Sequence, residues 1–273
     1  MYKGYVDACL TDEEYASIYE NPECNFLNCL QNEYVIIRNK DNEIVDKFKW
    51  DGSKYTKLSY KQINNDYVGR VKPRNPQQEL AFDMLQDKNT TIKVLSGCYG
   101  SGKTMIMIDT ALQLMKDGKF DKLIWVRNNH EVKDTKPIGA LPGEFFSKML
   151  WTAMPVADKV GGVDALEYLV QQDKINVEHL GFIRGRDFKN AIIMCSEAEN
   201  LSKQHVQLLI GRVGEGSNLW LDGDQKQTDS KIFEENNGLG AAIEKLKGHK
   251  LFGYVHLEKS ERSETAAMAD LLD

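Results

Sequence analysis

The chain has 273 residues, of which 41% are hydrophobic and 28% are charged, a composition that allows one substantial folded core and a small additional module. Its formal net charge is −6, so the composition does not indicate a nucleic-acid-binding protein, and any polyanion would have to contact a locally basic surface. The longest apolar runs, such as residues 191–195, are much shorter than a membrane span, and the first residues lack the features of a secretion signal.

The five cysteines of the chain are Cys9, Cys24, Cys29, Cys98 and Cys195. Their number is odd, and two of them fall in a predicted loop and a predicted core strand, which favours reduced thiols over a disulfide framework. Cys24 and Cys29 have no second pair of potential ligands nearby, so a zinc site is not expected. We therefore expect a cytoplasmic protein with no membrane partner.

Residues 1–66 differ in pattern from the rest of the chain. The stretch LTDEEYASIYEN predicts a short helix that begins after Thr11 or Asp12. Two β-rich runs, EYVII and EIVDKFKW, flank a polar turn at residues 39–42 and predict a hairpin. We expect residues 1–66 to form a small α+β module with a β-rich core. The polar stretch that follows contains Gly and Pro and predicts a linker at residues 67–74.

From residue 75 to residue 273 the pattern changes to strand, turn and helix in repeated order. Helical patterns at residues 104–118 and 203–213 alternate with short apolar runs. These apolar runs lie at residues 91–97, 122–127, 191–197, 218–224 and 254–258. Such alternation predicts an α/β domain in which helices cover both faces of a central parallel sheet.

The segment GCYGSGKT at residues 97–104 matches the phosphate-loop pattern G-x-x-x-x-G-K-[ST], with a predicted strand before it and a predicted helix after it. Glycines in such a loop let backbone N–H groups surround phosphate oxygens, and the helix N-terminus adds a favourable dipole. We expect Lys103 to reach the β- and γ-phosphates of ATP and the Thr104 hydroxyl to bind Mg2+. The other nucleotide-binding residues expected in the loop are Gly97, Gly100, Ser101 and Gly102.

Polar residues near other predicted elements indicate what the loop does with its nucleotide. Gln78, at the start of a predicted helix, carries a donor and an acceptor that could read the edge of adenine. Glu197 follows a predicted strand and could orient the attacking water. Asp224 and Gln227 follow the next predicted strand, where Asp224 could lie near the metal and Gln227 near the γ-phosphate. The carboxyl ends of parallel strands are where such sheets bind ligands.

Taken in order, these segments resemble the PhoH family, ATPases related to superfamily-one helicases. The resemblance covers roughly residues 70 to 273. It includes NPQQ, GCYGSGKT, the stretch VRNNHEV with IGALPGEFFSKM, the stretch GFIRGRDFKNAIIMCSEAEN, GDQKQTD and LEKSERSETAAMADLL. Residues 1–66 are similar to the segment that precedes the ATPase where PhoH is fused to a PIN nuclease domain, and we find no PIN-like sequence in this chain.

The resemblance implies a RecA-like core, ATP hydrolysis with Mg2+, single-stranded RNA as substrate with possible helicase activity, and assembly into a ring, expected to be a hexamer. Superfamily-one helicases hold nucleotide between two RecA-like domains, and this chain has length for one, so a second chain would complete each site. Arg262 then becomes a candidate finger toward a neighbour's γ-phosphate. The nucleic-acid candidates are Arg127, Arg184 and Arg186, because arginine holds a phosphate backbone bidentately.

The sequence departs from the family pattern at the end of the third strand. The family has Asp-Glu there, and this chain has Ser196 and Glu197, with Glu199 in place of the family's Gln. A neutral hydroxyl cannot replace the carboxylate that normally helps to hold Mg2+. Two functions therefore stay open: an ATPase that acts on RNA, or a nucleotide-binding scaffold or regulatory module with little hydrolysis. A small-molecule P-loop kinase is a third alternative, for which no second substrate site is recognisable.

Overall fold

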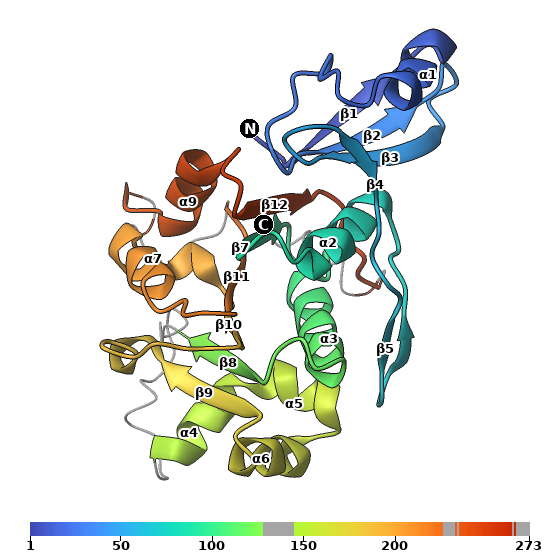
Figure 1. Ribbon diagram of the computed structural model, residues 1–273. Coiled ribbons are helices and arrows are strands. Elements are labelled where there is room, and N and C mark those ends of the chain that lie inside the picture. Colours follow the sequence, from blue (N-terminus) through green and yellow to red (C-terminus); the bar gives the residue numbers. More distant parts are fainter. Residues whose placement is uncertain (128–144, 226–232, 234, 264, 266–273) are drawn as a thin grey trace.

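A six-stranded parallel sheet forms the centre of the larger part of the molecule, as the prediction from the alternating pattern required (Figure 1). The structure is a computed structural model that describes residues 1–127, 145–225, 233, 235–263 and 265. The strands lie in the order β12-β7-β11-β10-β8-β9. Their bounds are β7 Ile92–Gly97, β8 Lys122–Arg127, β9 Ile175–His179, β10 Ala191–Cys195, β11 Asn218–Gly223 and β12 Phe252–Leu257.

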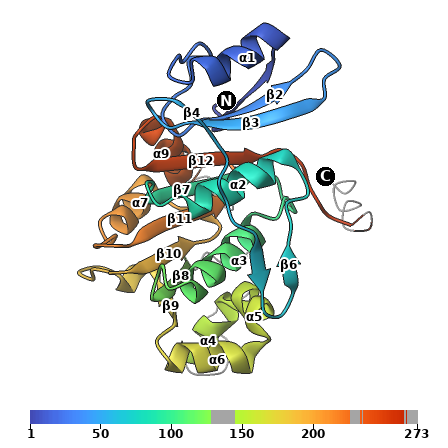
Figure 2. The same ribbon diagram turned by 45° about the vertical axis from the view of Figure 1, so that its right-hand side comes forward.

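Helices cover both faces of this sheet and bury its side chains in two separate cores (Figures 1 and 2). Successive residues of a strand point to opposite faces, so Trp220 packs on one side of β11, and Leu219 and Leu221 pack on the other. The helices on the Trp220 side are α2 Pro76–Gln86, α3 Lys103–Lys116, α4 Phe145–Thr152, α5 Met154–Val160 and α6 Val163–Gln171. Those on the other side are α7 Lys203–Ile210 and α9 Gly238–Leu246. The arrangement is consistent with a RecA-like P-loop fold and confirms the predicted fold class.

The small N-terminal module contains its own sheet, in the order β1-β2-β3-β4, and one helix. Of the two expected cap residues, Thr11 is the one that caps the helix, and it forms a capping box with Glu14. The predicted hairpin corresponds to antiparallel β2 and β3. The bounds are β1 Tyr5–Cys9, α1 Asp12–Glu20, β2 Tyr34–Arg38, β3 Ile44–Trp50 and β4 Tyr55–Lys57.

The segment predicted as a linker includes a strand and is held against the larger domain. Strands β5 Ile63–Asn65 and β6 Gly69–Val71 form a two-stranded ribbon. Asn65 in this ribbon donates from Nδ2 to Asp109 Oδ1 on α3 at 2.8 Å, and both residues are buried. The ribbon lies beside α3 in both ribbon views (Figures 1 and 2).

Direct contacts also join the N-terminal module to the larger domain. The Nδ2 atom of Asn32 lies 3.0 to 3.2 Å from the carbonyl oxygens of His249, Lys250 and Phe252, around the start of β12. The buried hydroxyl of Tyr34 on β2 donates to Asp83 on α2 at 2.9 Å. In the part of the chain that the structure describes, no helix has the length and apolar character needed to cross a membrane.

Candidate nucleotide-binding site

The phosphate loop occupies the bend between the end of β7 at Gly97 and the start of α3 at Lys103. Gly100 has a φ of 74°, in the left-handed region that glycine adopts without a steric cost. A Cβ atom at Gly97 would lie 2.4 Å from the carbonyl oxygen of Leu257 on β12, closer than van der Waals contact allows. Both glycines are therefore needed for the path of the loop.

Lys103 and Ser101 fold their side chains into this loop. The Lys103 ammonium donates to the carbonyl oxygens of Gly97 at 2.8 Å and Cys98 at 2.9 Å. The buried Ser101 hydroxyl donates to the same Cys98 oxygen at 2.8 Å. The positive charge is thus held at the loop itself, where the N-terminus of α3 adds its dipole. The loop geometry fits an anionic ligand.

Gln78 connects the start of α2 to the phosphate loop. Its Nε2 donates to the Ser101 carbonyl oxygen at 3.0 Å, and its Oε1 accepts from the backbone N–H of Arg74 at 2.8 Å. Only 2% of the residue is exposed. Gln78 therefore has a positioning contact with the loop, and its part in reading adenine stays a prediction.

Three side chains from neighbouring strands meet below the loop, on the face covered by α3. Strand alternation places Arg127, Ser196 and Asp222 on the same face as Trp125, Met194 and Trp220 respectively. The register pairs Cys195 with both Leu221 and Val126, so the next residue of each strand lies side by side at the carboxyl edge. This edge is the one from which the phosphate loop also emerges.

Asp222 is the site residue that the sequence reasoning missed. Its Oδ2 accepts a hydrogen bond from the Thr104 hydroxyl at 2.6 Å and another from Ser196 Oγ at 3.4 Å. Burial raises the pKa of Asp222 to about 6, although its bond with Thr104 acts in the opposite direction. A usable signal was present: Asp222 is an acidic residue inside an otherwise apolar strand, where an acidic side chain requires a partner.

Asp224, the metal ligand predicted from the sequence, lies just past the end of β11 and is 8% exposed. Its backbone N–H donates to Glu199 Oε2 at 3.1 Å. Burial raises the pKa of Glu199 to about 8. The Thr104 hydroxyl donates to Asp222 Oδ2, so the structure favours the earlier aspartate as the acidic partner of Thr104.

Glu197, the predicted catalytic carboxylate, follows Ser196 and is the second residue after the end of β10. Its backbone is left-handed, with φ 56° and ψ 44°, a conformation that is uncommon for a residue with a side chain and is often found at functional sites. The carboxylate forms an ion pair with Arg127 at the end of β8. About half of the Glu197 side chain is exposed, so solvent reaches it.

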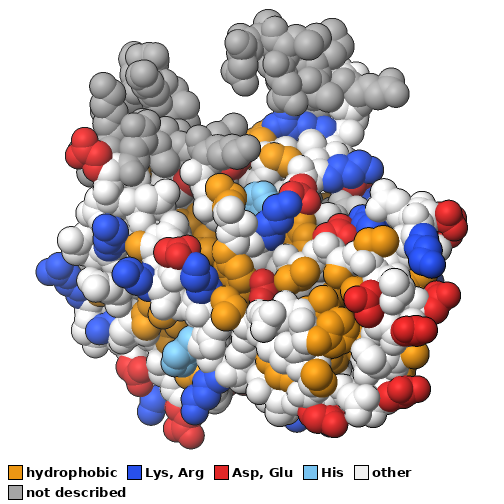
Figure 3. Space-filling view, turned by 90° about the horizontal axis from the view of Figure 1, so that it is seen from above, with side chains coloured by type: hydrophobic (Ala, Val, Ile, Leu, Met, Phe, Trp, Pro, Cys, Tyr) orange, Lys and Arg blue, Asp and Glu red, His pale blue; other side chains and the backbone are white. Residues whose placement is uncertain are grey.

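The three arginines proposed to contact nucleic acid have different surroundings. Arg127 is engaged by Glu197. Arg186 forms an ion pair with Glu178 on β9 and lies over the Phe188 ring, 4.7 Å from its centroid. Arg184 is exposed. On the face shown in Figure 3, the basic and acidic side chains of the described residues are interspersed. Their contact with RNA stays a prediction.

Arg262 lies over the phosphate loop of its own chain. Its guanidinium carbon is 3.7 Å from the centroid of the Tyr99 ring, within the range of a cation–π interaction. The backbone N–H of Glu261 donates to the Gly100 carbonyl oxygen at 3.0 Å and fixes this approach. The role of Arg262 toward a neighbouring chain is not tested by these contacts. Gln227, the remaining predicted catalytic residue, lies outside the described residues.

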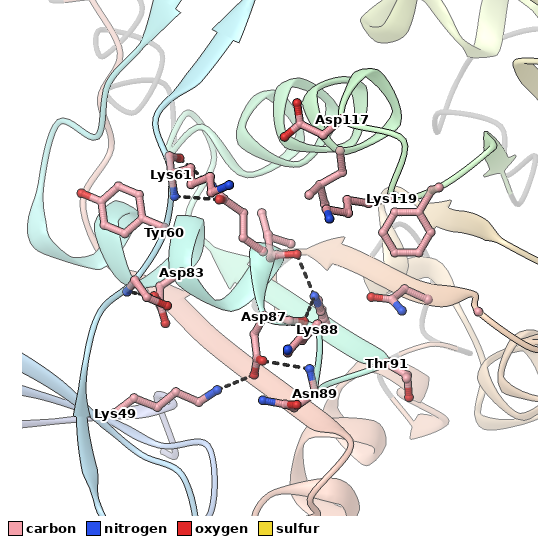
Figure 4. Close-up of a pocket in the computed structure, with 18 of the residues that line it drawn as sticks. Lys49, Tyr60, Lys61, Asp83, Asp87, Lys88, Asn89, Thr91, Asp117 and Lys119 are labelled. Atoms are coloured by element: carbon pink, nitrogen blue, oxygen red, sulfur yellow. Dashed lines mark hydrogen bonds and ion pairs between the residues drawn. The ribbon is translucent and has the colours of Figure 1, made fainter.

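A cavity of about 840 Å³ lies at the other end of the sheet, where β7 and β11 begin (Figure 4). Thr91 before β7, Lys119 after α3 and Asn218 at the start of β11 line it. Figure 4 shows Lys49 of the N-terminal module paired with Asp87 after α2 among the residues that line this cavity. Because the phosphate loop follows the opposite end of β7, the cavity is separate from the nucleotide site.

Comparison with known proteins identifies the family of the chain. A family model described as PhoH-like protein matches residues 70–271. Protein PhoH2 of Bacillus subtilis is 31% identical, with 100% of this chain and 64% of that protein aligned. Protein PhoH2 of Mycolicibacterium smegmatis is 30% identical over 72% of this chain and 46% of its own length. Protein PhoH of Escherichia coli is 26% identical over 61% and 48% respectively. The chain thus spans 46% to 64% of the length of these relatives.

Proposed function

This chain belongs to the PhoH family of ATPase-type P-loop proteins, and we propose that it binds and hydrolyses ATP and couples hydrolysis to the remodelling of single-stranded RNA. The observation that carries the proposal is the meeting of Lys103, Thr104 and Glu197 at one edge of the sheet. Lys103 and Thr104 begin α3 after the loop that follows β7, and Glu197 lies just past the end of β10, at the carboxyl edge where an open α/β sheet binds its ligand.

Each of these side chains has a defined task in the proposed reaction. Lys103 exchanges its bonds to the loop carbonyls for bonds to the β- and γ-phosphates, and backbone N–H groups of the loop bind the remaining phosphate oxygens. Glu197, exposed and next to Arg127, accepts the proton of the attacking water. Arg262 supplies a cation near the loop, which offsets charge that develops on the γ-phosphate.

Mg2+ would supply charge neutralisation between the β- and γ-phosphates. The residues present fit such an ion. Thr104 offers a hydroxyl at the start of α3, and the second carboxylate oxygen of its partner Asp222 is buried with no hydrogen-bond partner among the described residues. The described residues contain no group of three or more His, Cys, Asp and Glu that could hold a metal by themselves. That agrees with a Mg2+ ion bound mainly by phosphates and water.

RNA as substrate and assembly into a ring, with a hexamer as the expected size, are part of the same proposal. The ring is supported by Tyr99, which is 65% exposed on the phosphate loop and offers a surface for a neighbouring chain. RNA is supported by Arg127, the last residue of β8, and by Arg184 and Arg186 on the segment after β9. The second candidate function is a nucleotide-gated scaffold, which is favoured by the neutral Ser196 at the end of β10.

The test is ATP turnover with Mg2+, measured with and without single-stranded RNA, on the unchanged chain and on Glu197→Gln. We expect turnover that rises with RNA and that falls at least a hundredfold in Glu197→Gln, the usual weight of a general base. Binding of a fluorescent ATP analogue should persist in Glu197→Gln and be lost in Lys103→Ala. Binding without turnover above the Glu197→Gln level would contradict the ATPase and leave the scaffold.

A further inference from the structure

The end of β10 leaves the nucleotide site without one expected charge. In the family pattern a carboxylate precedes the catalytic glutamate, and in this chain the residue is Ser196. A hydroxyl is a poor partner for Mg2+ and its water shell, because hard divalent cations prefer charged oxygen ligands. The ATPase proposed above therefore needs another acidic side chain near Thr104.

Asp222 is in the position to provide that charge from the neighbouring strand. Strand β11 lies between β7 and β10, so it pairs with both the phosphate-loop strand and the strand that precedes Ser196. Asp222 points to the α3 face, and its Oδ2 joins the hydroxyls of Thr104 at 2.6 Å and Ser196 at 3.4 Å. The two hydroxyls and one carboxylate thus form a continuous polar group under the start of α3.

The other oxygen of the same carboxylate gives an independent indication of a ligand. Asp222 is 2% exposed, and its Oδ1 has no hydrogen-bond partner among the described residues. A buried carboxylate oxygen without a partner is unfavourable. A magnesium-bound water would satisfy it, as would the ion itself. Asp109 on the same helix as Thr104 provides a contrast, because both its oxygens are engaged, by Asn65 and Lys159.

We propose that Asp222 is the magnesium-directed carboxylate of this nucleotide site and that it acts through Thr104 and the water shell of the ion, in place of the carboxylate that Ser196 lacks. The inference rests on the proposed function, because it assumes that ATP binds at the loop with Mg2+. The negative charge that the family pattern places at the end of β10 would then lie on the neighbouring strand β11, on the same α3 face of the sheet. Ser196 then has a complementary role, since its small hydroxyl leaves room for Asp222 and donates to it.

The experiment measures nucleotide affinity and metal binding without relying on turnover. A fluorescent ATP analogue is titrated with Mg2+ and with EDTA, and Mn2+ bound in the presence of ADP is followed by electron paramagnetic resonance. We expect Asp222→Asn to keep the affinity measured in EDTA and to weaken Mg2+ and Mn2+ binding by about 10- to 100-fold, the effect typical of removing a group that supports a metal ligand. Asp109→Asn is the matched control for the loss of a buried carboxylate on the same face, and it should keep the metal dependence.

A rescue variant separates this role from a purely structural one. In Ser196→Asp combined with Asp222→Asn, the carboxylate returns to β10, and we expect most of the metal dependence to return. Unchanged metal dependence in Asp222→Asn would overturn the inference, as would its loss in Asp224→Asn instead. If the unchanged chain did not bind the analogue at all, the proposed function itself would be overturned. That outcome differs from normal analogue binding whose Mg2+ dependence does not change in Asp222→Asn, which would overturn only the role of Asp222.

Discussion

Arg127 and Glu197 form an ion pair between the ends of the neighbouring strands β8 and β10. The residue predicted to contact nucleic acid is therefore held by the residue predicted to activate water. Arg127 is mostly buried, whereas Glu197 is about half exposed. The arginine cannot pair fully with a phosphate and with Glu197 at the same time, so the proposed function implies that RNA binding at Arg127 and the state of the Glu197 carboxylate are coupled.

This coupling predicts that Glu197→Gln raises the affinity for single-stranded RNA when no nucleotide is present. The neutral amide holds the Arg127 guanidinium less tightly, and the arginine becomes available to a phosphate. A partly exposed ion pair contributes up to about 1 kcal/mol, so we expect an increase of about two- to fivefold. Fluorescence anisotropy of a labelled RNA measures it.

The control for this prediction is Arg127→Ala combined with Glu197→Gln, which should show no gain. The slope of log RNA affinity against log salt concentration should also be shallower in the double variant than in Glu197→Gln, by the amount that corresponds to about one phosphate contact. Equal RNA affinities for Glu197→Gln and the unchanged chain would show that Arg127 is not a phosphate ligand.

The position of Arg262 predicts that it acts on the nucleotide of its own chain. Its side chain stacks on Tyr99, and Glu261 is bonded to Gly100 of the same loop. Arg262→Ala should therefore lower ATP turnover, and mixing it with Lys103→Ala should not restore activity, because each chain lacks part of its own site. The measurement is ATP turnover of mixtures of the two variants over a range of mixing ratios. Recovery above the sum of the two variants would show that the arginine reaches a neighbouring chain.

Features that depend on residues close together in the chain could be predicted from the sequence. Thr11 is one of the two residues expected to cap the first helix, and residues 97–104 form the predicted loop between strand and helix. Strand β9 was not predicted, because only Ile175 is fully buried in this edge strand and its apolar signal is weak. The pairs Thr104–Asp222 and Arg127–Glu197 depend on the order of strands in the sheet, and local pattern does not contain that order.

Asn32 is predicted to be a main attachment of the N-terminal module. Its buried amide lies within hydrogen-bond distance of three carbonyl oxygens around the start of β12, and its φ of 68° is left-handed. Asn32→Ala removes these bonds, takes a donor away from the buried carbonyl of Phe252 and adds backbone strain. We expect a loss of about 2 to 4 kcal/mol in the free energy of unfolding, measured by urea denaturation.

Asn28 is the matched control for this variant. It also has a left-handed backbone, with a φ of 53°, but it is exposed. Asn28→Ala therefore carries the backbone cost without the loss of an amide contact to a buried carbonyl, and we expect a loss of about 1 kcal/mol. Similar losses for both variants would mean that the amide contacts of Asn32 contribute little to the attachment.

The raised pKa of Glu199 predicts that the free energy of unfolding depends on pH near neutrality. Burial, assisted by the carboxylates of Asp222 and Glu197, raises its pKa from 4.5 to about 8. Between these values the unfolded chain has released the proton and the folded chain retains it. The stabilising contribution is thus fully present below pH 4.5 and is lost as the pH rises toward about 8, at no more than about 1.4 kcal/mol per pH unit.

Glu199→Gln, which introduces the family's residue, should therefore flatten the dependence of unfolding free energy on pH between 6 and 8 and should be more stable than the unchanged chain at pH 8. The amide keeps the size of the side chain and an oxygen that can accept from the Asp224 N–H. Urea denaturation at a series of pH values measures the slope, and Glu215→Gln, at an exposed position, should leave the slope unchanged. Parallel slopes for Glu199→Gln and the unchanged chain would show that Glu199 is already ionised in the folded state, and that its contact with Asp224 compensates for its burial.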